Sequence, residues 1–505
     1  MLNNISVLQV GNDDYSSKLH IPEHIKWTFV NDLEDAEERS YDICFLTRNV
    51  NSKECKVIIK KIRAYTLFVL DTVKKDDDIS FLLTSRVGEI VSLEEFDSFL
   101  EHDSNYFYSY MYGEKFQPRH LSVSPDFKGN IYWNGYTGVE LEGDFGEEFH
   151  QVIYWRNNVP LYTYTPLENW LEYEKEGTVE IQLKFEEFQF GAVSTLLNRW
   201  IFTEEDMKTE SCFLEDEVNG GAIHASLLVK GKGKLVIKNL HDRHSRKNYG
   251  SFIPGGQRLV TSKREEVFAY FEPMDLKPPL NVYFSGYKTM EAFEGYYMMR
   301  KLGAPFILIT DNRLEGGGFY LGDEEYEGLI TSYIKSCLDK LGFDASQLVL
   351  SGLSMGTFGA LYNGCKLRPH AILLGKPLAN LGDIATNERI NRPGTFPTSL
   401  DVLVKNFGDM SDEAVSALNN RFWTLFDSTD WSNTKFIISY MYEDDYDSTA
   451  YSNIIGHMND LNVEIFGKGL HGRHNDNTGG IVSWFVNQYN QVLNVDFNRK
   501  SDEDE

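Results

Sequence analysis

One segment constrains the fold more than any other: Leu348-Val-Leu-Ser-Gly-Leu-Ser-Met-Gly-Thr-Phe-Gly-Ala-Leu-Tyr362. An apolar run leads into Gly352-Leu-Ser-Met-Gly356, and a helical pattern follows. A bare G-x-S-x-G match is common by chance, but a nucleophile elbow requires this strand–turn–helix context. The serine of such a turn has a strained backbone, which explains the glycine on each side of it. The segment therefore predicts a reactive serine, Ser354, at the end of a buried strand.

A serine nucleophile needs a histidine base, which follows an orienting acid in the chain order of this elbow class. The histidines after Ser354 are His370, His457, His471 and His474. His370 starts a strand before any suitable acid, and His457 lies in an expected surface helix. The other two lie in the loop after the last predicted strand, 463–466, where the base belongs. We favour His474, with His471 as the alternative.

The orienting acid should follow the preceding strand, Lys435–Tyr440. That strand ends in Met-Tyr-Glu-Asp-Asp-Tyr-Asp447, which offers several carboxylates. An acid a few residues past the strand end can turn back toward the histidine. Asp444 fits this requirement best, with Glu443 and Asp445 as alternatives.

Backbone N–H groups are expected to stabilise a developing oxyanion beside Ser354. The N–H of Met355 opens the helix after the elbow and has no acceptor within that helix. A second donor should come from Gly286 or Tyr287, in the loop after the strand Asn281–Phe284. The Gly-rich loop at 316–318 lacks the Lys-Ser/Thr of a phosphate cradle, and no spacing suggests a metal. Serine-triad chemistry needs neither metal nor cofactor.

The surrounding pattern predicts an α/β-hydrolase domain over 280–495. Strands and helices alternate there, with strands expected at 281–284, 306–310, 348–350, 371–374, 435–440 and 463–466. Between the second and third of these, apolar residues from Tyr326 to Leu341 share one helical face, and Gly342 stands at the C-terminal cap. Residues 496–505 are expected to form a solvated acidic tail.

Two further domains are predicted before residue 273. Residues 1–118 show a β/α, Rossmann-like pattern with strands at 5–10, 27–30, 43–46, 66–70 and 89–91 and a helix near Lys53–Ala64. The first strand ends in Gly11-Asn-Asp-Asp rather than G-x-G-x-x-G, which argues against a dinucleotide site.

Residues 119–272 show short alternating strands and turn residues, as in an all-β sandwich-like module, whose last strand is expected at Glu266–Tyr270. Four tryptophans of this region are expected to fill its core rather than to form a sugar-stacking platform: Trp133, Trp155, Trp170 and Trp200. The proline-rich segment Pro273–Pro279 is expected to link this module to the domain that follows.

Composition excludes several classes of function. The 505-residue chain has 49 basic and 76 acidic side chains, a net charge of −27, so it is a poor candidate for binding nucleic acid. Its 5 cysteines are scattered, without a disulfide framework or a zinc pattern. We see no signal peptide and no apolar stretch of about 18 residues that could cross a membrane. These features predict a protein of the reducing cytosol.

Several motifs together resemble one family. They are the Gly-Leu-Ser-Met-Gly-Thr-Phe-Gly-Ala-Leu-Tyr elbow, the Glu-Asp-Asp-Tyr-Asp acid loop and the Gly-Arg-His-Asn-Asp-Asn histidine loop, in a chain of about this length. The set resembles the acetyltransferase-like member of the accessory secretory proteins, which serve the accessory Sec export of serine-rich repeat glycoprotein adhesins in Gram-positive bacteria.

The resemblance implies O-acetylation of N-acetylglucosamine on the adhesin, with Ser354, Asp444 and His474 as the triad. It also implies a cytoplasmic protein that associates peripherally with the membrane through other accessory secretory proteins and a SecA-like motor. Two other functions stay open from the sequence. The chain could act as a non-catalytic scaffold of the export complex, or as a plain carboxylesterase, since transfer and hydrolysis share one acyl-enzyme.

Overall fold

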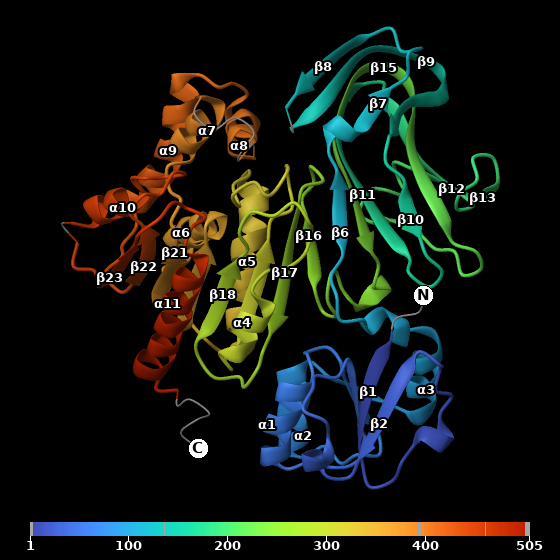
Figure 1. Ribbon diagram of the computed structural model, residues 1–505, viewed down its shortest axis with the longest axis vertical. Coiled ribbons are helices and arrows are strands. Elements are labelled where there is room, and N and C mark those ends of the chain that lie inside the picture. Colours follow the sequence, from blue (N-terminus) through green and yellow to red (C-terminus); the bar gives the residue numbers. More distant parts are fainter. Residues whose placement is uncertain (1–3, 136, 391–395, 397, 460, 500–505) are drawn as a thin grey trace.

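Three hydrogen-bonded sheets organise the computed structural model, which describes residues 4–135, 137–390, 396, 398–459 and 461–499 (Figure 1). The first sheet (blue) lies at the N-terminal end, the second (teal to green) is long and curved, and the third (yellow-green to red) forms the C-terminal part. Helices alternate with strands in the first and third sheets, so the predicted mixed α/β class is confirmed.

The first sheet has five parallel strands in the order β2-β1-β3-β4-β5. Its elements are β1 (Ile5–Val10), β2 (Ile25–Val30), β3 (Ile43–Leu46), α1 (Ser52–Lys61), β4 (Leu67–Leu70), α2 (Asp77–Arg86), β5 (Glu89–Val91) and α3 (Leu93–His102). Every predicted strand of this part has its counterpart. Helix α1 begins where a capping box dictates, because Asn51 accepts from the Glu54 N–H while Glu54 accepts from the Asn51 N–H.

The second sheet is antiparallel and has ten strands. They are β6 (Gly113–Phe116), β7 (Leu121–Val123), β8 (Asn130–Asn134), β9 (Gly138–Trp155), β10 (Val159–Leu161), β11 (Leu167–Gly177), β12 (Glu180–Phe188), β13 (Leu196–Thr203), β14 (Cys212–Leu214) and β15 (Gly221–His244). The sequence predicts a sandwich-like module, whereas hydrogen bonds join all these strands in one sheet. The reason is the length of β15, whose 24 residues pair with β6, β9, β10, β11 and β12 along its course.

The tryptophans of this region only partly match their prediction. Trp155 and Trp170 are 3% and 1% exposed, and Trp200 packs partly buried against the core of the sheet. Trp133 on β8 is 53% exposed, so it does not fill the core.

The third sheet has eight strands in the order β16-β17-β19-β18-β20-β21-β22-β23. They are β16 (Gln257–Val260), β17 (Glu266–Glu272), β18 (Leu280–Phe284), β19 (Phe306–Thr310), β20 (Leu348–Leu353), β21 (Ala371–Gly375), β22 (Lys435–Met441) and β23 (Ile465–Leu470). β17 runs antiparallel to β16 and β19, and the pairings from β19 to β23 are parallel.

The helices of this part are α4 (Tyr296–Lys301), α5 (Glu324–Leu341), α6 (Met355–Leu367), α7 (Leu381–Ile390), α8 (Thr398–Phe407), α9 (Asp412–Asp427), α10 (Ala450–Met458) and α11 (Thr478–Gln491). Helix α5 matches the predicted face, and its C-cap Gly342 has φ 71° as that position requires. Within the described residues, no helix is long and apolar enough to cross a bilayer.

The strand before the proline-rich segment belongs to a different sheet from the one predicted. The strand expected at the end of the all-β module, Glu266–Tyr270, is part of β17, which pairs with β19 in the third sheet. Pro273–Pro279 therefore joins two strands of one sheet rather than two domains. All seven residues of β17 are buried, so no polar–apolar alternation marks the sheet to which it belongs. Likewise β6, within the predicted N-terminal part, pairs with β15 of the second sheet.

Asp496, the first residue of the predicted solvated tail, does not match the prediction. The Asp496 carboxylate accepts from Lys435 Nζ and lies 2.8 Å from His370 Nε2. Burial would raise the pKa of Asp496, but Lys435 and His370 outweigh burial and lower it. Asp496 therefore belongs to the folded part of the protein. Residues 500–505 of the predicted tail lie outside the described part of the chain.

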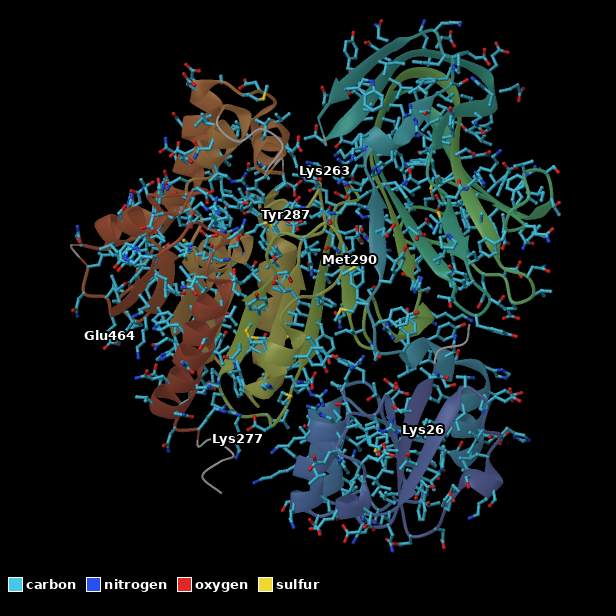
Figure 2. All side chains as sticks on the ribbon, in the orientation of Figure 1. Lys26, Lys263, Lys277, Tyr287, Met290 and Glu464 are labelled. Carbon is cyan, nitrogen blue, oxygen red and sulfur yellow. The ribbon has the colours of Figure 1, made fainter. Side chains whose placement is uncertain are left out.

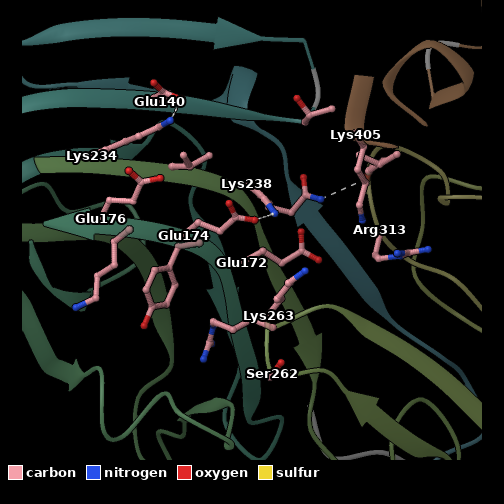
Figure 3. Close-up of a pocket in the computed structure, with 17 residues that line it drawn as sticks. Glu140, Glu172, Glu174, Glu176, Lys234, Lys238, Ser262, Lys263, Arg313 and Lys405 are labelled. Carbon is pink, nitrogen blue, oxygen red and sulfur yellow. Dashed lines mark hydrogen bonds and ion pairs between the residues drawn. The ribbon is translucent and has the colours of Figure 1, made fainter. Parts of the chain in front are cut away.

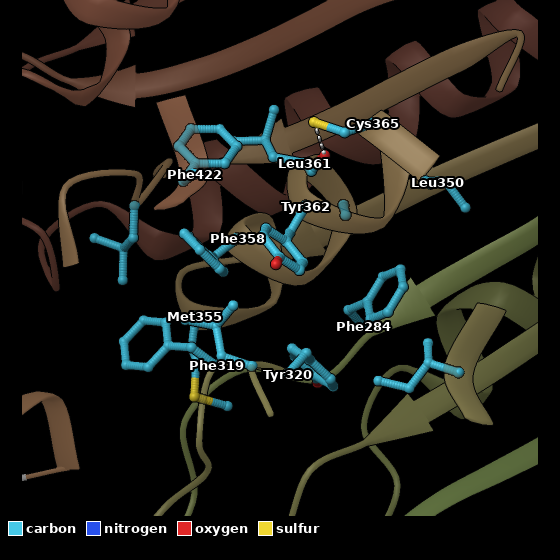
Figure 4. Packing of buried hydrophobic residues seen from close by; sticks show 14 of the residues in the cluster. Phe284, Phe319, Tyr320, Leu350, Met355, Phe358, Leu361, Tyr362, Cys365 and Phe422 are labelled. Carbon is cyan, nitrogen blue, oxygen red and sulfur yellow. Dashed lines mark hydrogen bonds between the residues drawn. The ribbon is translucent and has the colours of Figure 1, made fainter. Parts of the chain in front are cut away.

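Helix α6 packs tightly against the third sheet (Figure 4). Phe358 meets Phe319 edge-to-face at 6.0 Å between ring centroids, and Phe284 meets Tyr320 edge-to-face at 5.0 Å. Met355, the first residue of α6, is fully buried in the same cluster. This packing fixes the N-terminus of α6 at the carboxyl ends of β18 and β20, where the predicted site lies.

Candidate active site

Ser354 occupies the single position between β20 and α6. Its φ of 52° and ψ of −122° form a strained conformation of the kind that costs about 1–3 kcal/mol. The Ser354 N–H donates to the Gly375 carbonyl at 2.8 Å, which ties the turn to β21. A Cβ on Gly356 would lie 2.0 Å from the Phe284 carbonyl oxygen, and one on Gly352 would lie 2.3 Å from the Gly356 carbonyl. Only glycine permits this close approach.

A continuous line of hydrogen bonds leads from Ser354 to a carboxylate. Ser354 Oγ lies 2.8 Å from His474 Nε2, and His474 Nδ1 lies 2.8 Å from Asp444 Oδ2. The other carboxylate oxygen, Oδ1, accepts from the N–H groups of Tyr446 and Asp447 at 2.8 and 3.1 Å. His474 and Asp444 are 1% and 7% exposed, so water competes little for these bonds.

The structure also places the alternative candidates. The side chains of Glu443 and His471 pair with each other at 2.9 Å, and they are 54% and 84% exposed. The pKa of Glu443 is lowered, first by the Gly472 N–H that it accepts and then by His471. Asp445 accepts from the backbone N–H of His474 at 3.1 Å. Among the three adjacent acids, Asp444 is therefore the one that contacts the His474 ring.

The predicted oxyanion loop lies beside the elbow. The N–H of Gly286 donates to Glu294 Oε2 at 2.6 Å, so this predicted donor already has an acceptor. The loop is held in place by Tyr320, whose hydroxyl donates to the Ser285 carbonyl at 2.6 Å. Tyr287 follows in the same loop after β18, at the upper end of the third sheet in Figure 2. Met355 N–H opens α6 as expected.

Sequence reasoning missed three charged side chains around the triad and the oxyanion loop. Glu294 holds the oxyanion loop through Gly286, and Lys376 follows β21 directly. Burial lowers the pKa of Lys376, while Asp444 and Glu294 oppose the shift. Burial also lowers the pKa of Lys288 to about 8, again against Glu294. No motif marks these residues, although Lys376 could have been found from its place at the carboxyl end of a parallel strand.

A row of aromatic rings connects the histidine to the oxyanion loop. Tyr446 stacks on the His474 ring at 4.3 Å, and Phe396 stacks on Tyr446 at 5.2 Å between centroids. Tyr287 meets Phe396 edge-to-face at 5.0 Å. The site is therefore walled by apolar rings on the side between the base and the expected oxyanion donors.

Comparison with known proteins finds similarity along nearly the whole chain. Residues 5–499 match the model of the family described as Accessory Sec system GspB-transporter. The chain belongs to this family.

Individual relatives of this accessory Sec system family cover the same length. An accessory Sec system protein of Streptococcus gordonii is 37% identical over 511 residues, which span 99% of this chain and 100% of the relative. One from Staphylococcus aureus is also 37% identical, over 98% of this chain and 97% of the relative. A chain of the Glycosylation Associate Protein (Gap123) complex from Streptococcus agalactiae superposes with a TM-score of 0.86 at 35% identity, covering 98% of this chain and 99% of that one.

This family member also has a cavity of about 750 Å³ between the second and third sheets (Figure 3). Its walls carry ion pairs, among them Lys234 with Glu140 at 3.0 Å and Lys238 with Glu174 at 2.5 Å. None of the predicted catalytic residues lines this cavity. Within the described part of the chain, no group of three or more His, Cys, Asp or Glu side chains is arranged to hold a metal ion.

Proposed function

We propose that this accessory Sec system protein is a serine-dependent O-acyltransferase with an α/β-hydrolase catalytic domain. The observation that carries the proposal is the line of hydrogen bonds from Ser354 Oγ through His474 to Asp444. A mostly parallel sheet with an elbow after β20 supports the same fold class. The strained backbone of Ser354 gives further support, because a purely structural turn gains nothing from that strain.

The first half-reaction forms an acyl-enzyme. Asp444 accepts from His474 Nδ1–H, so Nε2 is free to take the proton of Ser354 Oγ as this oxygen bonds to the acyl carbonyl carbon. The carbonyl oxygen gains the negative charge, and we assign its stabilisation to the N–H groups of Met355 and Tyr287. His474 then gives its proton to the departing oxygen or sulfur of the acyl donor, and the carbonyl bond to that atom breaks.

The second half-reaction transfers the acyl group to a hydroxyl. His474 Nε2 takes the proton of the acceptor hydroxyl, whose oxygen attacks the acyl-Ser354 carbonyl, and the proton returns to Ser354 Oγ as the ester bond breaks. The apolar row of Tyr287, Phe396 and Tyr446 suits a short acyl chain. We propose acetyl transfer to N-acetylglucosamine on a serine-rich glycoprotein adhesin, with no metal or cofactor required.

We further propose that the protein works within an export complex. A relative is part of the Gap123 complex, which supports assembly of this chain with other accessory secretory proteins. In this proposal the protein is cytoplasmic, reaches the membrane peripherally through these partners and a SecA-like motor, and binds no nucleic acid. A scaffolding role is compatible with catalysis.

The test compares wild type with Ser354→Ala and, as a matched control, Ser336→Ala on the exposed side of α5. A fluorophosphonate should label wild type and Ser336→Ala but not Ser354→Ala. Mass spectrometry of the adhesin glycans should show acetyl groups disappearing only in Ser354→Ala, while pull-down of the partners is unchanged.

Each other outcome has a distinct meaning. Acetyl groups that persist in Ser354→Ala would favour the scaffold. Labelling together with ester hydrolysis but no glycan acetylation would favour a plain carboxylesterase. If both acetylation and partner binding are lost in Ser354→Ala, the proposed separation of chemistry from assembly is wrong.

A further inference from the structure

A buried ionic cluster joins the second sheet to the segment that carries the oxyanion loop. We call it the junction cluster: His241 and Arg243 on β15, Glu266 on β17, and Glu291 between β18 and α4. Arg243 Nε donates to Glu291 Oε2 at 2.6 Å, and its terminal nitrogens donate to Glu266 at 3.0 and 2.7 Å. His241 Nδ1 bonds to the other oxygen of Glu291. All four residues are at most 2% exposed.

The charges of the cluster hold Glu291 as a carboxylate. Burial would raise the pKa of Glu291, but Arg243 and His241 outweigh it and lower the pKa to about 2. Both cations come from the second sheet, so the ionised Glu291 is bound there from two directions. An ionised group this deeply buried depends on its partners, because removing one of them leaves an uncompensated charge.

Glu291 is a fixed point in the segment from Gly286 to Glu294. Its own N–H donates to the Gly113 carbonyl of β6 at 2.8 Å, a second tie to the second sheet. Lys288 Nζ bonds to the carbonyl of Ala292, next to Glu291 in the chain. Figure 2 shows Met290 at this boundary between the second and third sheets.

The other end of the same segment reaches the catalytic site. Three residues beyond Glu291, Glu294 accepts from the Gly286 N–H at 2.6 Å. That bond fixes the Ser285–Gly286 peptide, which directly precedes the peptide that carries the Tyr287 N–H. Contacts anchored in the second sheet therefore lead, within one short loop, to the backbone beside Ser354.

We propose that Arg243 and His241 are positioning residues for the reaction at Ser354. By holding Glu291 they fix the 286–294 segment, and through Glu294 they orient the Tyr287 N–H toward the developing oxyanion. The all-β part of the chain is then a working part of the acyl-transfer site. This inference rests on the proposed function, because an oxyanion donor matters only if Ser354 performs acyl chemistry.

A second buried pair provides a matched control. Glu272, also on β17, accepts from Arg86 of α2 at 2.7 Å, and both side chains are 0% exposed. This pair joins the first sheet to the third and likewise links an arginine of one sheet region to a carboxylate of another. Within the described residues, neither side chain of this pair forms a hydrogen bond or ion pair with the 286–294 segment. Glu272→Gln therefore reproduces the loss of a buried charge without touching the oxyanion loop.

The kinetic test compares Glu291→Gln, Arg243→Lys and Glu272→Gln with wild type in full-length protein. The substrate is p-nitrophenyl acetate, and kcat and KM are measured separately. Loss of one oxyanion donor costs about 10²–10³-fold in kcat, so misalignment by Glu291→Gln should cost about 10–100-fold with KM within about twofold. Arg243→Lys should lose less kcat than Glu291→Gln but more than Glu272→Gln, and Glu272→Gln should stay within about twofold of wild type. Equal kcat in Glu291→Gln and Glu272→Gln would overturn the inference.

A second readout does not depend on turnover. Hydrogen exchange of the peptide covering 285–295 should be faster in Glu291→Gln and Arg243→Lys than in wild type, and unchanged in Glu272→Gln. Exchange in α6 should be unaffected, since the junction cluster does not contact that helix in the described structure.

The two proposals fail separately. If wild type shows no Ser354-dependent ester hydrolysis, the proposed function is wrong, and unchanged exchange at 285–295 would refute the positioning role as well. If wild type is active but neither kcat nor exchange distinguishes Glu291→Gln from Glu272→Gln, only the positioning role is wrong. Should Glu291→Gln fail to fold, Arg243→Lys supports the same comparison.

Discussion

Asp444→Asn should abolish most of the activity because of the two backbone bonds behind the carboxylate. Oδ1 of Asp444 accepts from the N–H groups of Tyr446 and Asp447, so the amide oxygen of an asparagine must take that place. Its NH₂ group then faces His474 Nδ1, where Oδ2 stood at 2.8 Å. An NH₂ donor there requires an unprotonated Nδ1, which puts the ring proton on Nε2. In that tautomer His474 cannot accept the proton of Ser354.

The size of the loss follows from the tautomer. A serine triad with its histidine held in the wrong tautomer loses about 10⁴-fold in kcat, which is about 5.5 kcal/mol of transition-state stabilisation. The assay is steady-state hydrolysis of p-nitrophenyl acetate, with thermal unfolding as the check on folding. The asparagine keeps the two backbone bonds, so we expect little change in the melting temperature.

The two neighbouring acids are the matched controls. Glu443→Gln changes an exposed pair with His471, and we expect activity within about twofold, as is usual for surface ion pairs. Asp445→Asn keeps an acceptor for the His474 N–H and should lose less than about tenfold. Activity of Asp444→Asn within about tenfold of wild type, or a larger loss in Glu443→Gln, would refute this assignment of the acid.

Three other outcomes are expected. His474→Ala should lose about 10³-fold or more in kcat while the exposed His471→Ala loses little, and the reverse order would show that the wrong histidine was chosen. Gly356→Ala should lower the melting temperature because its Cβ meets backbone at 2.0 Å, whereas Gly328→Ala on α5 meets nothing within 4 Å and should raise stability by about 0.5–1 kcal/mol. Burial lowers the pKa of His241, but Glu291 outweighs burial and raises this pKa from 6.5 to about 9. The free energy of unfolding should therefore fall as the pH rises from 6.5 to about 9. That fall should be shallower in His241→Gln, and identical pH profiles would contradict the shift.

The elbow could be predicted from sequence because its requirements are local. Glycines at 352 and 356, an apolar strand and a helix start all lie within one short segment. Chain order then led to His474 and Asp444, the pair that the structure brings to Ser354. The choice between His474 and His471 was open in the sequence, because both follow the last strand. In the structure His474 is buried and contacts Ser354 and Asp444, whereas His471 is exposed and pairs with Glu443.

What escaped prediction depends on contacts between distant segments. The hydrogen bond from the Gly286 N–H to Glu294 forms only when the whole 286–294 loop is folded, and nothing in the sequence marks Glu294 as the acceptor. Arg243 on β15 and Glu291 in the loop before α4 are 48 positions apart in the chain, so their contact depends on the tertiary fold. The placement of β17 failed for another reason, since a strand buried on both faces carries no pattern that reveals its neighbours.

The membership of β17 in the third sheet has a practical consequence for dissecting the protein. A fragment that starts at the proline-rich segment, near residue 280, would lack β16 and β17 and would leave β19 as the edge of the sheet. That edge, Phe306-Ile-Leu-Ile-Thr310, is wholly apolar but for its last residue, and such an unpaired edge pairs readily with other chains. A catalytic fragment cut there should aggregate, whereas one that keeps the residues from 257 onward retains the complete sheet.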